Sequence, residues 1–279
     1  MFDQAHLAHY LQLWSLQQDG VAIHTHAACL LPVLHGGQPA MLKLSAGGDE
    51  RRAASVLRWW DGDGAVRVLA ASPDADADGY ALLLERALAT RPLAGLVQLA
   101  HAGEAGDAAA TTILCAVAAR LHAPRPAPPP PLPALSGCFA ALAAAAARGG
   151  VLSACHAVAQ DLLAAPQDSV VLHGDLHHAN VLDGGARGWL AIDPKGYVGE
   201  RGFDFANLLC NPDAALATAP GRLQRQVALI AAAAQLDAAR LLAWVVAWSG
   251  LSAAWHVEDG TPPQTALAVA AIALAALHA

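Results

Sequence analysis

The sequence is poor in charged residues and has no excess of positive charge. Only 14% of its 279 residues are Asp, Glu, Lys or Arg, and the formal net charge is −7. A nucleic-acid-binding protein normally presents a basic face, so this balance argues against that class. Hydrophobic residues make up 56% of the chain, which argues against a disordered protein. An acidic protein is compatible with a cationic substrate.

Long hydrophobic runs are also absent. The most apolar stretch, residues 265–279, is shorter than the ~20 residues that span a bilayer, and residues 1–20 carry acidic and histidine side chains. We therefore expect no membrane partner and no secretory signal. The five cysteines form no Cys-x-x-Cys pair. This pattern favours reduced, buried thiols in a cytoplasmic protein.

Polar residues follow two short apolar runs, 169–172 and 189–192, which we predict to be buried strands. Asp175 and Asn180 come after the first run, and Asp193 comes after the second. These side chains could converge on one point. Such a set suits chemistry in which one Asp receives a proton while an Asn and another Asp hold Mg²⁺, because hard cations take oxygen ligands. The alternative is a hairpin whose acids serve only solubility.

The same stretch resembles a known family. Residues 173–180 (HGDLHHAN), followed by 192–194 (IDP), resemble the kinase-type catalytic loop and metal-binding Asp of the aminoglycoside phosphotransferases. The continuation, 193–196 (DPKG) with 202–209 (GFDFANLL), is similar to the branch of streptomycin 6-phosphotransferases and hydroxyurea phosphotransferases. The resemblance implies ATP as the phosphate donor.

Within this resemblance, Asp175 is the catalytic residue that accepts or orients the proton of the acceptor hydroxyl. Asn180 and Asp193 are the ligands of a Mg²⁺ ion that bridges the phosphates. Asp204 is expected to brace the catalytic loop. His173 and His177 are expected to hold the loop by hydrogen bonds and not to act as bases.

A first lobe is predicted over residues 1–88, with a helix at 2–17 and short strands up to Leu44. Lys43 is a single charge in an apolar strand, and burying an ammonium group is costly without an anionic partner. In the kinase-like interpretation, Lys43 binds the nucleotide phosphates and pairs with Glu50, in a helix from Asp49 to Trp60. Alternatively, Lys43 lies on the wet face of an edge strand, and both acids merely favour a helix N-terminus.

Nucleotide recognition has fewer sequence signals. No Gly-x-Gly-x-x-Gly loop is present. The corresponding turn is 24–28, where Thr25 is the candidate for phosphate contact, and His24 and His26 are interpreted as core or surface histidines. Residues 80–87 resemble the hinge strand between lobes. Backbone groups from Glu85 to Ala87 would then bind the adenine edge.

A second, larger helical lobe is predicted over residues 89–279. Residues 125–133 are rich in proline, so we expect an extended surface connector. Helices are predicted at 107–121, 135–148, 151–165, 220–249 and 251–256. If the acceptor is cationic, acids should line its pocket, and the candidates are Glu200, Asp213, Glu258 and Asp259. Lys195 either contacts the transferred phosphate or forms a surface ion pair.

Together these features predict an α+β, two-lobed, protein-kinase-like fold with a β-rich N-lobe and a helical C-lobe. The resemblance implies a small-molecule kinase that uses ATP and Mg²⁺ to phosphorylate streptomycin at its 6-hydroxyl, giving antibiotic resistance. The alternatives are a kinase for hydroxyurea or another small hydroxyl compound, and a non-catalytic nucleotide-binding protein. A more remote alternative is a metal-dependent hydrolase with His173, Asp175, His177 and His178 as ligands, joined by His156 and His256.

Overall fold

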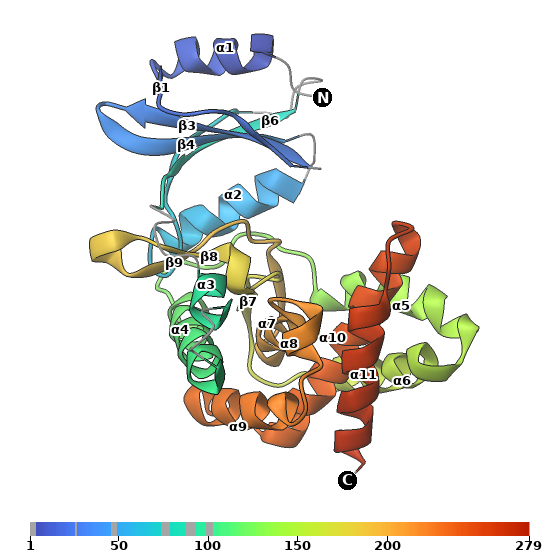
Figure 1. Ribbon diagram of the computed structural model, residues 1–279. Coiled ribbons are helices and arrows are strands. Elements are labelled where there is room, and N and C mark those ends of the chain that lie inside the picture. The colour runs from blue at the N-terminus through green and yellow to red at the C-terminus, as the bar shows by residue number, and fades with distance from the viewer. Residues whose placement is uncertain are drawn as a thin grey trace.

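The computed structural model describes residues 4–25, 27–45, 49–73, 79–87, 93–98 and 103–278. Its N-terminal part is a sheet that lies between two helices, with α1 on one face and α2 on the other (Figure 1). The elements of this part are α1 Gln4–Leu13, β1 Gln17–Gln18, β2 Ile23–His24, β3 Ala28–His35, β4 Gln38–Ser45, α2 Asp49–Trp60, β5 Val68–Ala71 and β6 Tyr80–Glu85. The predicted helix over Asp49–Trp60 is therefore confirmed.

The six-stranded sheet is antiparallel, with the order β1-β3-β4-β6-β5 and β2 added to β3. β3 and β4 form a hairpin whose turn residues, Gly36 and Gly37, both have positive φ (55° and 79°). A two-residue turn of this kind favours glycine because a Cβ resists that conformation. β4 is a central strand of the sheet, so the alternative interpretation, in which Lys43 lies on an edge strand, is wrong.

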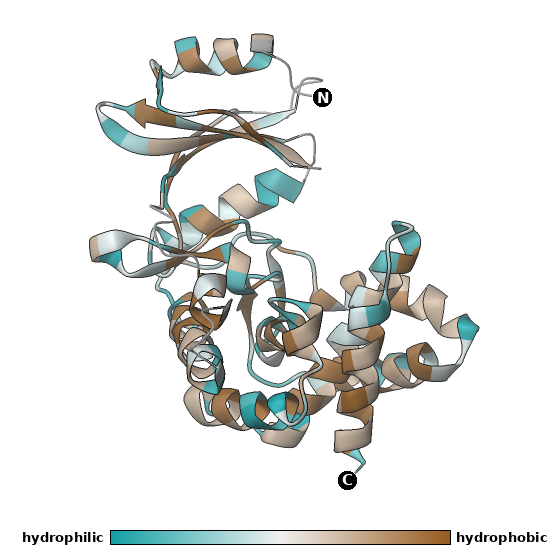
Figure 2. Ribbon diagram, in the orientation of Figure 1, coloured by the Kyte–Doolittle hydropathy of each residue, from teal (hydrophilic) through white to brown (hydrophobic). Residues whose placement is uncertain are grey.

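Alternation along the strands decides which helix each side chain faces. Leu42 and Leu44 of β4 belong to the cluster that packs against α1, and the intervening Lys43 points to the opposite face, where α2 lies. Lys43 is only 8% exposed. The fold thus places a buried ammonium group between the sheet and the first turn of α2, which is the hydrophilic end of that helix in Figure 2.

The rest of the chain is mainly helical and carries two small antiparallel sheets, β7–β10 and β8–β9. Its helices and strands are α3 Leu93–Gln98, α4 Gly103–His122, α5 Ala140–Ala145, α6 Gly150–Ala164, β7 Ser169–Leu172, β8 Val181–Asp183, β9 Trp189–Ala191, β10 Tyr197–Glu200, α7 Gly202–Ala206, α8 Ala214–Ala217, α9 Arg222–Ala234, α10 Ala238–Glu258 and α11 Gln264–Leu277. Short 3-10 helices are η1 Leu135–Phe139, η2 Ala146–Arg148, η3 His178–Asn180, η4 Gly185–Arg187 and η5 Asn207–Cys210. Residues 125–133 form neither helix nor strand, as predicted from their prolines.

α10 is the central helix of this part and packs against α5, α6, α7, α9 and α11. The predicted helices 220–249 and 251–256 are wrong in their boundaries. A break occurs at Gln235, which adopts a left-handed conformation (φ 52°), and α10 then runs unbroken through Gly250. Glycine is required there because a Cβ at this position would overlap Cys155 of α6.

The apolar helices are largely internal, and Trp244 in the middle of α10 is 1% exposed. Taken one at a time, the helices that the structure describes are each too short or too polar to cross a membrane. α9 and α10 pass a length and composition test only as a pair, bent by 119° at their junction.

The two parts share one hydrophobic core. Ala191 of β9 donates its N–H to the Gly64 carbonyl (2.8 Å) and accepts from Val66 N–H (3.1 Å). Trp60 at the end of α2 donates its indole N–H to the Leu121 carbonyl of α4 (3.1 Å). The β8–β9 hairpin therefore lies directly below α2 (Figure 1). The lobe boundary predicted at residue 88 falls outside the described residues and stays a prediction.

Candidate active site

The loop after β7 is held in place by hydrogen bonds to a buried carboxylate. Asp204 of α7, which is 1% exposed, accepts hydrogen bonds from the backbone N–H of His173 (2.8 Å) and of Gly174 (2.7 Å). His122 Nε2 lies 2.9 Å from the same carboxylate. Burial alone would raise the pKa of Asp204, but these donors outweigh it and hold the pKa below its usual range. The expected bracing contact of Asp204 is therefore present.

His173 links this loop to the segment after β9. Its Nδ1 accepts from Asp175 N–H (3.2 Å), and its Nε2 lies 2.9 Å from the Ile192 carbonyl, to which it donates. Burial lowers the pKa of His173, so the ring is neutral at pH 7 and carries its proton on Nε2. Both ring nitrogens are used in structural hydrogen bonds, which agrees with a loop-holding residue and not with a base.

Asp175 projects from this loop with about a third of its side chain exposed (32%). Asn180 Nδ2 donates to the backbone carbonyl of Asp175 (2.8 Å) and to its Oδ2 (3.3 Å). Asn207 Nδ2 donates to Oδ1 (3.0 Å). His177 caps η3 by accepting from Ala179 N–H (3.2 Å). The carboxylate is thus oriented by two amides and still open to solvent, as a group that receives a proton from a substrate must be.

Asn180 and Asp193 are brought together by the β8–β9 hairpin, in which Ile192 N–H donates to the Asn180 carbonyl (2.9 Å). The Asn180 NH₂ group is used by Asp175, which leaves its amide oxygen available as a ligand. Mg²⁺ is bound by oxygen ligands, typically one or two carboxylates completed by phosphates and water. The donor set of these two residues fits that ion.

Lys43 forms ion pairs with two carboxylates. Its Nζ lies 2.6 Å from Glu50 Oε1 of α2 and 2.6 Å from Asp193 Oδ1. Burial alone would lower the pKa of Lys43, but the two carboxylates raise it above its ordinary value, so the ammonium form persists. The ion pair expected between Lys43 and Glu50 therefore forms, and it joins β4, α2 and the segment after β9.

A further contact fixes α2 against the same segment. Arg52 donates from Nε to the Lys195 carbonyl (2.5 Å), and its guanidinium lies 5.2 Å from the centre of the Tyr197 ring. Lys195 N–H in turn donates to the His173 carbonyl (2.7 Å). The position of Glu50 is thereby coupled to that of the loop that carries Asp175.

The predicted hinge residues lie at the end of β6. The Glu85 side chain pairs with Arg187 of η4 and accepts from Arg67 N–H (3.1 Å), so it connects the sheet to the β8–β9 hairpin. Ala87 is partly buried against the shared core. Thr25 uses its hydroxyl within its own turn, donating to the Ala28 carbonyl (3.1 Å) and accepting from Ala28 N–H (3.0 Å). His26 lies outside the described residues.

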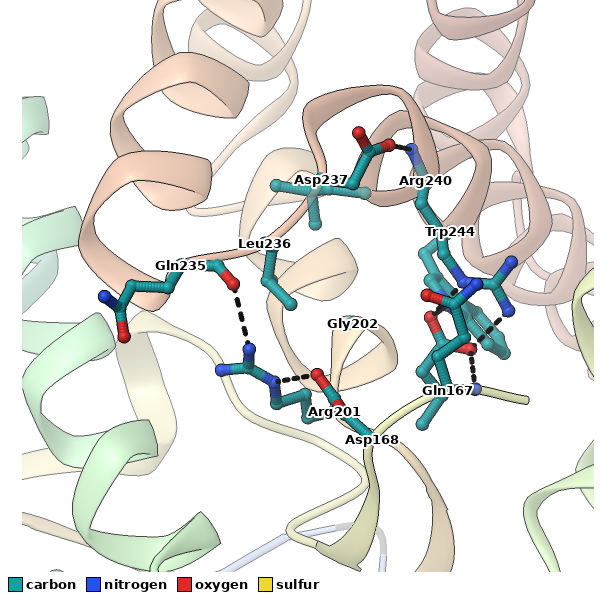
Figure 3. Close-up of a pocket in the computed structure, with 11 residues that line it drawn as sticks. Gln167, Asp168, Arg201, Gly202, Gln235, Leu236, Asp237, Arg240 and Trp244 are labelled. Carbon is teal, nitrogen blue, oxygen red and sulfur yellow. Dashed lines mark hydrogen bonds and ion pairs between the residues drawn. The ribbon is translucent and has the colours of Figure 1, made fainter.

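Glu200 was predicted as an acid for a cationic acceptor, and this prediction is wrong. Its carboxylate is buried and accepts from Arg240 Nη2 (2.6 Å), Trp244 Nε1 (2.7 Å) and Gln167 N–H (2.9 Å), so its hydrogen-bonding capacity is filled. These residues line a small pocket of about 50 Å³, shown in Figure 3, that also contains Arg201. It contains none of the residues around Asp175, and its charged side chains form the ion pairs Arg240–Glu200 and Arg201–Asp168.

The other candidate acids are exposed. Asp213 caps α8 by accepting from Leu216 N–H (2.9 Å), and Glu258 and Asp259 lie at the end of α10. Among the described residues, no group of three or more His, Cys, Asp or Glu side chains is placed to hold a metal ion. Because a hydrolytic zinc site needs such a cluster, this arrangement gives the metal-dependent hydrolase no support.

Sequence reasoning gave no role to three residues of this site: Asn207, Arg52 and His122. Asn207 lies inside the 202–209 motif, but the motif does not indicate its contact with Asp175. Arg52 and His122 are ordinary helix residues in sequence, with partners 143 and 82 positions away.

Comparison with known proteins shows to which family the chain belongs. A model of the family described as aminoglycoside/hydroxyurea antibiotic resistance kinase matches residues 13–260. A streptomycin 3″-kinase of Klebsiella pneumoniae is 47% identical over 90% of this chain and 92% of its own length. A streptomycin 6-kinase of Streptomyces griseus is 34% identical over 96% of this chain and 87% of its own.

Among solved structures, a thermostable mutant of aminoglycoside phosphotransferase APH(4)-Ia, in ternary complex with AMP-PNP and hygromycin B, superposes with a TM-score of 0.68. It is 14% identical and covers 97% of this chain and 96% of that chain. At this identity the likeness concerns the fold. It confirms the predicted α+β, two-lobed kinase-like fold.

Proposed function

Because the chain belongs to the aminoglycoside/hydroxyurea antibiotic resistance kinase family, we propose that it transfers the γ-phosphate of ATP to a hydroxyl group of streptomycin. The family makes the protein a phosphotransferase, and the predicted relationship to aminoglycoside phosphotransferases is confirmed. The observation that carries the proposal is the cluster formed by Lys43, Glu50 and Asp193 beside the oriented carboxylate of Asp175.

The hydroxyl oxygen of the acceptor attacks the γ-phosphorus of ATP, and Asp175 accepts the proton of that hydroxyl. ADP is the leaving group. Lys43, held by Glu50, binds the donor phosphates through its ammonium group. Asn180 and Asp193 would hold Mg²⁺ through their side-chain oxygens, and the bound ion would supply neutralisation of phosphate charge. Little covalent help is needed in phosphoryl transfer, so positioning and charge neutralisation account for the residue types.

We place the adenine at the end of β6. The backbone between Glu85 and Ala87 supplies its hydrogen bonds, and Leu84, which is 7% exposed, packs toward its ring. The ion pair of Glu85 with Arg187 supports this position by holding the strand end against the β8–β9 hairpin. In this proposal, residues up to about 88 form the nucleotide-binding lobe and the rest of the chain forms the catalytic lobe.

Streptomycin is favoured as acceptor by the streptomycin kinases among the relatives. Its two guanidinium groups suit the acidic balance of the chain, because carboxylates bind guanidinium by paired hydrogen bonds. The resemblance to the branch of streptomycin 6-phosphotransferases implied the 6-hydroxyl. The higher identity to the 3″-kinase, 47% against 34%, instead favours the 3″-hydroxyl as the phosphorylated position.

The test is product analysis after incubation with Mg²⁺, ATP and streptomycin. Proton–phosphorus correlation spectroscopy assigns the phosphate to the methylated glucosamine ring for the 3″ position or to the streptidine ring for the 6 position. A product on the streptidine ring would overturn the 3″ assignment. ADP release without any streptomycin product would remove the acceptor and leave hydroxyurea or another small hydroxyl compound to be tested.

A non-catalytic nucleotide-binding protein is the second candidate. It is disfavoured because Lys43, Asp175, Asn180 and Asp193 are all present and arranged together. ATP binding without turnover on any acceptor in a panel of aminoglycosides and small hydroxyl compounds would favour it.

A further inference from the structure

Asp175 receives one hydrogen bond on each carboxylate oxygen, and the shorter of the two comes from η5. Asn207 Nδ2 donates to Oδ1 at 3.0 Å, and Asn180 Nδ2 donates to Oδ2 at 3.3 Å. The terminal torsion of an Asp side chain is broad when nothing holds it. Because Asn180 is also the proposed metal ligand, Asn207 is the partner whose side chain is committed to Asp175 and not to the nucleotide.

The direction of the Asn207 amide is set by its own neighbour. Asn211 Nδ2 donates to Asn207 Oδ1 (2.9 Å) and to the Asn207 carbonyl (3.0 Å). An amide oxygen that accepts from Asn211 leaves the NH₂ group of Asn207 facing Asp175. Asn207 is 3% exposed, so water does not compete strongly for these bonds.

The segment that carries both amides is anchored by a buried ion pair. Arg222 of α9 pairs with Asp107 of α4 through Nε (2.8 Å) and Nη2 (3.0 Å), and both side chains are at most 5% exposed. The same guanidinium donates to the Leu209 carbonyl (3.2 Å) and the Asn211 carbonyl (2.9 Å). Bidentate, charge-assisted bonds of this kind fix geometry as well as adding free energy.

We propose that Asn207 and Asn211 are positioning residues that fix the orientation of the Asp175 carboxylate, with the Arg222–Asp107 pair as their anchor. A buried amide is less favourable for stability than an apolar side chain of similar size. Asn207 is buried and Asn211 is partly buried, and their hydrogen bonds lead to the proposed proton acceptor, so a positioning role accounts for these two amides. The inference rests on the proposed role of Asp175.

The kinetic test uses Asn207→Leu, Asn211→Ala and the double variant. Asn207→Leu is near-isosteric and removes the donor, so kcat is expected to fall roughly 100-fold while KM for ATP changes less than about twofold. Asn211 acts only through Asn207, so the double variant should be no slower than Asn207→Leu alone. Asp237→Asn is the matched control, because it is an exposed acid that keeps its role as the N-cap of α10 and should retain the parental kcat.

A second measurement does not depend on the acceptor. The signals of the Asn207 side-chain amide protons are assigned because they disappear in Asn207→Leu. Hydrogen exchange of these protons should become roughly 3- to 10-fold faster in Asp175→Ala and in Asn211→Ala, because each variant removes one hydrogen bond of the Asn207 side chain. Parental exchange rates in both variants would overturn the proposal even if streptomycin proves not to be the acceptor. Independent, multiplicative losses in kcat would also overturn it, because they would mean that Asn211 acts separately.

Discussion

Replacing Asp204 by Asn should destabilise the fold far more than the same replacement at an exposed acid. Asp204 is 1% exposed and accepts from two backbone N–H groups and from His122. An amide has one acceptor oxygen, so in Asp204→Asn at least one donor loses its partner and faces an NH₂ group. The matched control is Asp168→Asn, whose side chain is 67% exposed in an ion pair with Arg201.

The magnitude follows from those contacts. A hydrogen bond to a charged group contributes about 1.5–3 kcal/mol, and a buried donor left without a partner costs about 1–3 kcal/mol. Together they give a loss of roughly 2.5–6 kcal/mol in the free energy of unfolding for Asp204→Asn. The control, Asp168→Asn, should lose less than about 1 kcal/mol of unfolding free energy, because exposed ion pairs contribute little to stability.

Urea denaturation of parent and variants at pH 7 measures the difference. The pKa of Asp204 is held below that of an unfolded Asp, about 3.9, so its contribution is present above that pH and is lost as the pH falls through the lower folded value. The gap between parent and Asp204→Asn should therefore narrow only below pH ~4. If Asp204→Asn unfolds within about 1 kcal/mol of the control, the bracing role of Asp204 is refuted.

Three further predictions concern the site and the core. Lys43→Met should lower kcat/KM for ATP by about 10²- to 10³-fold, because it removes the ammonium group that pairs with both Glu50 and Asp193. Steady-state kinetics check this, and a near-parental kcat/KM would count against the nucleotide role of Lys43. Gly250→Ala should lower the free energy of unfolding, measured by urea denaturation, by about 1–3 kcal/mol, because the new Cβ overlaps Cys155. Adding Cys155→Gly should recover part of this loss. An unchanged denaturation midpoint in Gly250→Ala would contradict the close packing of the two helices. Chelation with EDTA should abolish ADP release and Mg²⁺ should restore it, whereas turnover in EDTA would contradict the metal assignment.

Much of the site could be predicted because its residue types stand out locally. Lys43 is a lone charge in an apolar strand, and the cost of burying it requires a nearby carboxylate, which the first turn of α2 supplies in Glu50. Asp175, Asn180 and Asp193 follow strand ends on either side of a hairpin, so their convergence depends on local geometry that periodicity and turn residues reveal.

The remainder depends on contacts between distant segments. Glu200 looks like any exposed acid in sequence, and only the fold brings Arg240 and Trp244 to it from 40 or more positions away. Gly250 reads as a helix breaker, yet close packing on Cys155 keeps α10 continuous. Asn207 carries no charge or periodicity that would mark it as a partner of Asp175. Such roles are fixed by tertiary packing and leave no local signal.

The most direct test is single-turnover transfer of phosphate from radiolabelled ATP to streptomycin by the parent protein and by Asp175→Asn. The account predicts labelled streptomycin with the parent and a rate about 10²- to 10⁴-fold lower with Asp175→Asn, which should still bind ATP because Lys43 and Asp193 are intact. Transfer at the parental rate by Asp175→Asn would contradict the assignment of Asp175 as the residue that receives the proton.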